Sequence, residues 1–261
     1  MNGLFFAIAF LACAIGKICG MGGGVIIKPV MDATGLLPLS TINFCSACTV
    51  AAMACWSVGK SFLTQEAKIS AKTSTALAIG SAIGGVIGKA AFSTMLSGFG
   101  DDRLSDAIQA VLLIVATLLT LLYTLRKDKI SSMHITSLTS CAGIGLFLGA
   151  LGAFLGIGGG PFNMAVLYYF FSMATKTAAI NSLYIILFSQ LTAIGSTVLR
   201  GQIPDVDGVL LLGMALAGLL GSEVGGALNR HLSEKEATRL FETAILLVIG
   251  ISLYNLYHCL R

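Results

Sequence analysis

Long apolar runs separated by short charged turns dominate the chain. Eight of these runs approach or exceed the length of a membrane-spanning helix, about 20 residues: residues 3–19, 41–58, 73–96, 105–125, 135–155, 178–199, 206–228 and 237–257. Two shorter apolar runs lie between them, at residues 25–37 and 161–173. The pattern predicts an all-α polytopic membrane protein with eight full spans and two short helices.

The composition fits a chain that is almost entirely membrane-embedded. Of the 261 residues, 56% are hydrophobic and 11% are charged, with a mean hydropathy of +0.91. Soluble domains carry about 25% charged residues. Eight spans leave no room for a soluble domain, so any function belongs to the membrane part. We expect a multi-pass protein of the cell membrane, as in a bacterial inner membrane.

A glycine-rich break interrupts the apolar pattern twice, at residues 20–24 (GMGGG) and 156–160 (GIGGG). Glycine costs about 1 kcal/mol in a helix relative to alanine and allows positive φ angles. Inside a bilayer, exposed backbone groups are tolerated only where protein buries them or where they line a wet cavity. Paired broken helices are therefore the best pointer in a sequence to a transport site.

The two breaks belong to a longer internal repeat. Gly20 precedes Gly156 by 136 residues, and Asn43 precedes Asn181 by 138. Three further glycines recur at an offset of 133: Gly80, Gly85 and Gly88 match Gly213, Gly218 and Gly221. The charged turns at 101–103 and 234–236 follow the same offset. We predict two homologous repeats, residues 1–130 and 131–261.

The orientation of the repeats depends on whether the two short helices carry the chain across the membrane. If they do, the second half is inverted and the basic loop residues divide ten against three between the two sides. If they do not, the halves are parallel and the division is eight against five. Positive residues accumulate on the cytoplasmic side. The sharper division favours inverted repeats with both termini outside.

The paired G-x-G-G-G motifs, about 135 residues apart in a membrane protein of this size, resemble the TauE/SafE family of sulfite and organosulfur anion exporters. Pro29 and residues 181–183 (NSL) add weaker support. The departures are Lys28 before Pro29, Pro161 directly after the second glycines, and Phe44 where the other repeat has a small polar residue. The resemblance implies transport of a small, often sulfur-containing anion without ATP hydrolysis.

The helix that follows each break offers backbone N–H groups and a positive dipole end, which together bind anions without a cationic side chain. The candidate substrate contacts are Gly22, Gly23, Gly24, Gly158, Gly159 and Gly160. The alternative is that these glycines only allow close helix packing. Asn43 and Asn181 are either further substrate contacts or helix caps.

Charged residues inside the spans cost at least about 2.5 to 3.5 kcal/mol at a helix centre and are usually paired or functional. Lys28 either contacts the anion or pairs with Asp32 four residues on. Lys17 either neutralises the anion or extends to the membrane interface. Glu223 lies near the repeat equivalent of Lys89, and a pair between these two residues could couple transport to an ion.

Several functions are disfavoured. The chain has no G-x-x-x-x-G-K-[ST] phosphate loop, no histidine within the spans and no metal-ligand spacing. We therefore expect no enzyme, no cofactor or metal, and no nucleic-acid partner. The leading hypothesis is a secondary transporter, exporting by alternating access and coupled to protons. An anion channel or a carboxylate transporter is the alternative. The partners expected are the anion, the bilayer and a second copy in a homodimer.

Overall fold

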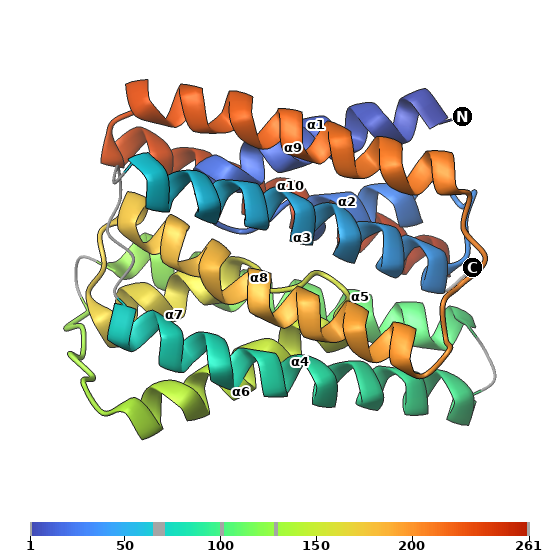
Figure 1. The fold of residues 1–261 in the computed structure, drawn as a ribbon, viewed down its shortest axis with the longest axis horizontal. Helices are drawn as coiled ribbons and strands as arrows, with labels where there is room; N and C mark the ends of the chain where they lie inside the picture. Colours follow the sequence, from blue (N-terminus) through green and yellow to red (C-terminus); the bar gives the residue numbers. More distant parts are fainter. Residues whose placement is uncertain (1, 65–70, 100–101, 128–129, 260–261) are drawn as a thin grey trace.

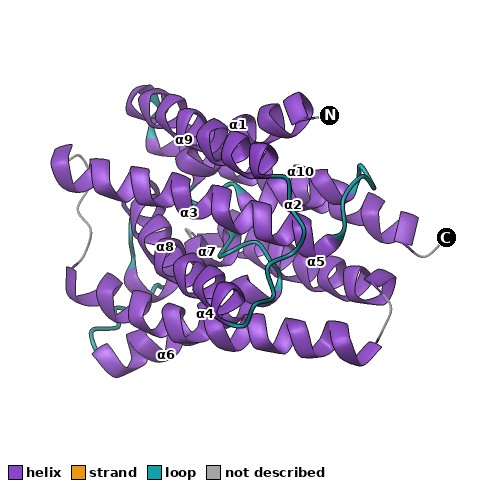
Figure 2. Cartoon of the chain, turned by 45° about the vertical axis from the view of Figure 1, so that its right-hand side comes forward, coloured by secondary structure: helices purple, strands orange, loops and turns teal. Residues whose placement is uncertain are grey.

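The computed structural model describes residues 2–64, 71–99, 102–127 and 130–259. These residues form ten helices and no strand, which confirms the all-α class (Figures 1 and 2). The helices are α1 (Asn2–Cys19), α2 (Gly24–Asp32), α3 (Leu39–Thr64), α4 (Ala71–Phe99), α5 (Asp102–Arg126), α6 (Leu138–Phe154), α7 (Pro161–Phe171), α8 (Thr175–Leu199), α9 (Gly208–His231) and α10 (Glu234–Cys259).

Seven of the described helices are long and apolar enough to cross a membrane, and α6 is a shorter apolar helix of 17 residues. It starts three residues later than predicted because Ser137 caps it, accepting from the N–H of Ser140. Leu212, Leu216 and Leu220 of α9 are exposed, as expected for a face that contacts lipid. The chain is a multi-pass membrane protein.

The two short helices are even shorter than the apolar pattern predicts. Helix α2 has nine residues and stops at Asp32, before Gly35, which has a φ of +61°. Helix α7 has eleven residues and ends at Phe171, before the C-cap residue Ser172, whose backbone is left-handed with a φ of +50°. Helix α2 packs against α1, α3 and α10, and α7 packs against α5 and α8 (Figure 1).

The path of the chain defines two faces of the bundle. Asn2, at the start of α1, donates a hydrogen bond to Asp207, and Thr41, at the start of α3, donates to the carbonyl of Asp205. We call this end, where both termini lie (Figure 1), the terminal face. The opposite end holds Lys60 and Arg230, and we call it the basic face. Helix α1 runs toward the basic face and α2 returns toward the terminal face.

Glycines on the long helices join the two halves of the chain tightly. A Cβ at Gly84 or Gly88 of α4 would collide with backbone carbonyls of α6, and one at Gly221 or Gly225 of α9 would collide with those of α1. Such close approach is typical of helix pairs in membranes. Helix α4 of the first half thus packs on α6 of the second, and α9 of the second half packs on α1 of the first, so the halves interlock.

This packing can be tested with two matched substitutions. Gly84→Val would place a β-branched side chain against the carbonyl of Leu146, whereas nothing lies within 4 Å of the corresponding position at Gly143. We expect Gly84→Val to destabilise the protein by about 1–3 kcal/mol or more through overpacking. In detergent, its thermal unfolding midpoint should fall well below that of Gly143→Val. Equal midpoints for the two variants would contradict the interlocked arrangement.

Candidate functional site

Each glycine-rich break is a sharp reversal of the chain that only glycine accommodates easily. Gly20 and Gly156, just beyond α1 and α6, have φ angles of +67° and +70°. Beyond α6, the N–H of Gly156 bonds to the carbonyl of Ala153, and the N–H of Ile157 bonds to the carbonyl of Gly152. These two bonds form a Schellman motif, which satisfies the last carbonyls of the helix and requires a left-handed residue after it.

After each reversal the chain returns along the helix it has just left. A Cβ at Gly16 of α1 would lie 2.6 Å from the carbonyl carbon of Gly22, and one at Gly152 of α6 would lie 2.5 Å from the nitrogen of Gly159. Gly16 and Gly152 are separated by the same 136 residues as Gly20 and Gly156. The two hairpins are therefore built by the same packing, and they depend on a glycine in the helix as well as in the break.

The two hairpins meet in the interior. A Cβ at Gly24 would lie 2.7 Å from the carbonyl oxygen of Ile157, and Gly22 and Gly159 both pack against Ile186 of α8. The structure thus brings the two predicted glycine motifs together. In the structure the N–H of Gly158 donates to the carbonyl of Gly152 inside the hairpin, at 3.0 Å.

Polar side chains with unused hydrogen-bonding capacity surround the hairpins. A buried polar atom without a partner costs about 1–3 kcal/mol, so such atoms are rare unless water or a ligand satisfies them. Among the described residues near the hairpins they are both amide atoms of Asn43, the hydroxyls of Ser46, Ser182 and Ser189, and the amide oxygen of Asn163. This interior has the polar character expected around a small hydrophilic substrate.

The two predicted asparagines differ in the structure. The amide nitrogen of Asn181 donates to the carbonyl of Thr177 at 2.7 Å, and its amide oxygen accepts from the hydroxyl of Ser74. Asn43 lies against Gly156 with both amide atoms unpartnered. In this conformation Asn181 joins α8 to α4, while the amide of Asn43 is available to a ligand.

A cavity of about 340 Å³ lies at the basic face, between the ends of α1, α3 and α9 and the start of α8. Its charged lining residues are Lys17, Lys60, Lys176, Arg230 and Glu223. The excess of cations favours anions in this cavity, which we call the basic cavity. Ala179 in its wall packs against Gly20, so this one residue lies between the cavity and the first hairpin.

The predicted pair between Glu223 and Lys89 is wrong. Glu223 forms an ion pair with Lys60 and accepts a hydrogen bond from the indole N–H of Trp56 at 2.8 Å, and its side chain is 42% exposed. Lys89 lies over the ring of Phe92, with 5.6 Å between the ammonium nitrogen and the ring centroid. Helix α9 packs on α1 and α3, whereas α4 packs on α6 and α8. Equivalent positions in the repeats are therefore not neighbours.

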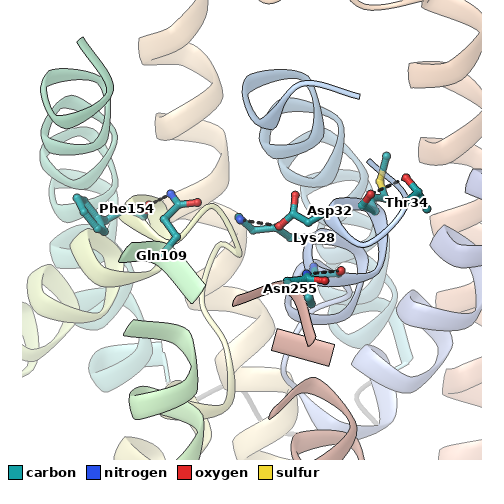
Figure 3. Close-up of polar contacts among 8 residues, drawn as sticks. Lys28, Asp32, Thr34, Gln109, Phe154 and Asn255 are labelled. Carbon is teal, nitrogen blue, oxygen red and sulfur yellow. Dashed lines mark hydrogen bonds and ion pairs between the residues drawn. The ribbon is translucent and has the colours of Figure 1, made fainter. Parts of the chain in front are cut away.

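A second large cavity, of about 670 Å³, opens at the terminal face beside α2 (Figure 3). Lys28 is buried in its wall and forms an ion pair with Asp32 at 2.9 Å, which is the pairing that the sequence left open. Gln109 donates to the carbonyl of Phe154, and Asn255 donates to the carbonyl of Pro29. Sequence reasoning missed these two amides, although each stands alone within an apolar run.

A helical membrane protein with two broken helices meeting among polar side chains, and with cavities on both faces, has the architecture of a membrane transporter. The sequence model of the family described as sulfite exporter TauE/SafE matches residues 5–253. The chain belongs to this family.

One curated relative agrees with this class. The chain is 22% identical to the "Probable membrane transporter protein YunE" of Bacillus subtilis (strain 168) over 273 residues, covering 94% of each chain. No solved structure matches the chain. The protein is thus a membrane transporter of the TauE/SafE family.

The contrast between the two asparagines gives a test. Asn181→Leu should lower the thermal unfolding midpoint in detergent, because it strands the buried hydroxyl of Ser74 at a cost of about 1–3 kcal/mol. Asn43→Leu keeps the number and branching of the side-chain heavy atoms and removes a polar group that has no partner, so it should lower the midpoint less than Asn181→Leu does. A larger loss of stability in Asn43→Leu than in Asn181→Leu would overturn this assignment.

Proposed function

We propose that the protein is a secondary transporter that exports a small sulfur-containing anion such as sulfite, thiosulfate or an organosulfonate. The observation that carries the proposal is the basic cavity, which four cations and one carboxylate line at one face and whose wall residue Ala179 packs against the first glycine hairpin. A sulfur oxyanion presents several acceptor oxygens, and it matches a site rich in N–H donors and positive charge.

The anion is held where the two hairpins meet. The anion approaches the backbone at two places: at the start of α2, at Gly22, Gly23 and Gly24, and before α7, at Gly159 and Gly160. Asn43 donates from its unpartnered amide. Lys28, one turn along α2, contributes positive charge from its pair with Asp32, and Asn181 comes into reach when its bond to Ser74 opens. In this conformation Gly158 serves the hairpin rather than the ligand.

Transport proceeds by alternating access between two inverted repeats, residues 1–130 and 131–261. Three observations support this mechanism: the common start of α1, α3 and α9 at one face, the return of α2 toward that face, and the shared construction of the two hairpins. The basic face is cytoplasmic, following the positive-inside rule. A membrane potential that is negative inside favours anion exit by about 2.3 kcal/mol per charge and 100 mV, which suits export.

Flux measurements in membrane vesicles test the function. We expect counterflow of radiolabelled sulfite, thiosulfate or a small sulfonate that is lost in Gly23→Val and Gly159→Val, because a side chain at either glycine would collide with Cys13 or Ile186. Gly143→Val is the matched control and should transport normally. The level of inserted protein is measured alongside, so that loss of flux is not confused with loss of protein.

The same vesicles separate the competing functions. If the protein transports small carboxylates in preference to every sulfur anion, the substrate class is carboxylates and not sulfur anions. Flux without counterflow, at rates that never saturate with the anion, would indicate a channel. No flux of any of these anions in the unsubstituted protein would overturn the proposed function. Cross-linking in the same membranes tests the predicted homodimer.

Proton coupling through Glu223 is a separate proposal, now with Lys60 as its partner in the basic cavity. Protonation of Glu223 would break its ion pair with Lys60 and so change the charge of the basic cavity. Glu223→Gln should preserve counterflow but abolish accumulation driven by a pH gradient. Unchanged pH-driven accumulation in Glu223→Gln would exclude this residue. If the pair only stabilises the fold, Glu223→Gln lowers protein yield and adding Lys60→Met restores it.

A further inference from the structure

The basic cavity has a counterpart deeper in the protein. A small cavity is lined by the end of α6, the start of α3, the second half of α8 and the Lys89 region of α4. The basic cavity is lined by the end of α1, the start of α8, the second half of α3 and the end of α9. If α1 is exchanged for α6, α3 for α8 and α9 for α4, one set of helices becomes the other. The two cavities therefore occupy equivalent places in the two repeats.

The correspondence extends to three of the ten residues that line the small cavity. At the offset of 136 that relates the two hairpins, Lys17 in the basic cavity corresponds to Ala153 in the small one. At the offset of 138 that relates the two asparagines, Trp56 corresponds to Ile194. At the offset of 133 that relates the glycines of α4 and α9, Ser222 corresponds to Lys89. These offsets were set by other residues, so the match is independent of the cavities.

The two cavities differ in volume. The basic cavity measures about 340 Å³, whereas its counterpart measures about 20 Å³, enough for a single water molecule. An anion with several oxygens fits the first and not the second. The structure thus combines one open and one closed copy of the same cavity, and the open copy faces the basic side.

The closed cavity is nevertheless equipped for an anion. Asn43 is 4% exposed and leaves both of its amide atoms unpartnered there. Lys89 and Gln190 share the lining, and the side chain of Gln190 lies against Gly158 of the second hairpin. Each cavity has a lysine at a place where its counterpart has a small residue. Lys17 of the basic cavity corresponds to Ala153 of the small cavity, and Lys89 of the small cavity corresponds to Ser222 of the basic cavity.

We propose that Asn43, Lys89 and Gln190 form a second anion-binding pocket, closed in this conformation, which opens toward the terminal face when the basic cavity closes. The proposal rests on the proposed function and adds a substrate site for the opposite side of the membrane. Lys89 leaves the ring of Phe92 and neutralises the anion in the open pocket, as the cations of the basic cavity do at the other face.

Side-specific kinetics test this pocket. Sulfite counterflow is measured in vesicles of both orientations, so that the half-saturating concentration is obtained separately at each face. Lys89→Gln should raise this concentration about tenfold at the terminal face and change it less than twofold at the basic face. Lys72→Gln, an exposed substitution on the same helix that lines none of the described cavities, is the matched control and should change neither value.

A cavity-filling variant gives a second, independent readout. Ala193→Leu fills the closed pocket, so it should abolish counterflow while sulfite still protects the protein from thermal unfolding, which reports a folded chain that binds at the basic face. An equal shift at both faces in Lys89→Gln, no shift at all, or normal counterflow in Ala193→Leu would overturn the second pocket. Absence of counterflow in the unsubstituted protein would instead overturn the proposed function for this anion.

Discussion

The backbone at the two glycine-rich breaks must be kept from lipid, and the rest of the structure depends on how this is done. Within the hydrocarbon of a bilayer an unpaired N–H or C=O group costs several kcal/mol. The hairpins avoid this cost by folding back onto their own helices at Gly16 and Gly152, and by packing against each other in the interior. Long helices then pack against the short helices that follow the breaks, α1, α3 and α10 against α2, and α5 and α8 against α7. The same burial keeps the backbone N–H and C=O groups of the breaks away from lipid, in an interior where they can contact a small polar solute.

The interlocking of the two halves follows from the same requirement. Neither half encloses its own hairpin, since α4 of the first half packs on α6 of the second and α9 of the second packs on α1 of the first. Gly20 likewise packs against Ala179 in α8, and Gly156 packs against Asn43 in α3. Each hairpin thus contacts helices of both halves of the chain. Such shared packing suits the alternating access that we propose, because the two faces must not open together.

Charge in the protein is concentrated where a cavity opens. Lys17, Lys60, Lys176 and Arg230 converge on one cavity from four different helices, and Glu223 is tied to Lys60 and Trp56 at its rim. Lys28, which is buried outside this cavity, is paired with Asp32. The family match and the YunE relative establish a transporter, and this distribution of charge indicates why its substrate is an anion.

The sequence by itself determined the features that depend on local composition: the membrane class, the long helices, the two breaks and the repeat offsets. These follow from apolar run length and from the backbone freedom of glycine, which act over a few residues. Only the tertiary structure decided which groups meet. From repeat equivalence, the sequence predicted a pair between Glu223 and Lys89. In the folded protein Glu223 pairs with Lys60, and Lys89 lines the same pocket as Asn43. Equivalent asparagines likewise acquired different partners. Contacts between helices distant in sequence depend on how the halves interlock, and no run of neighbouring residues encodes that.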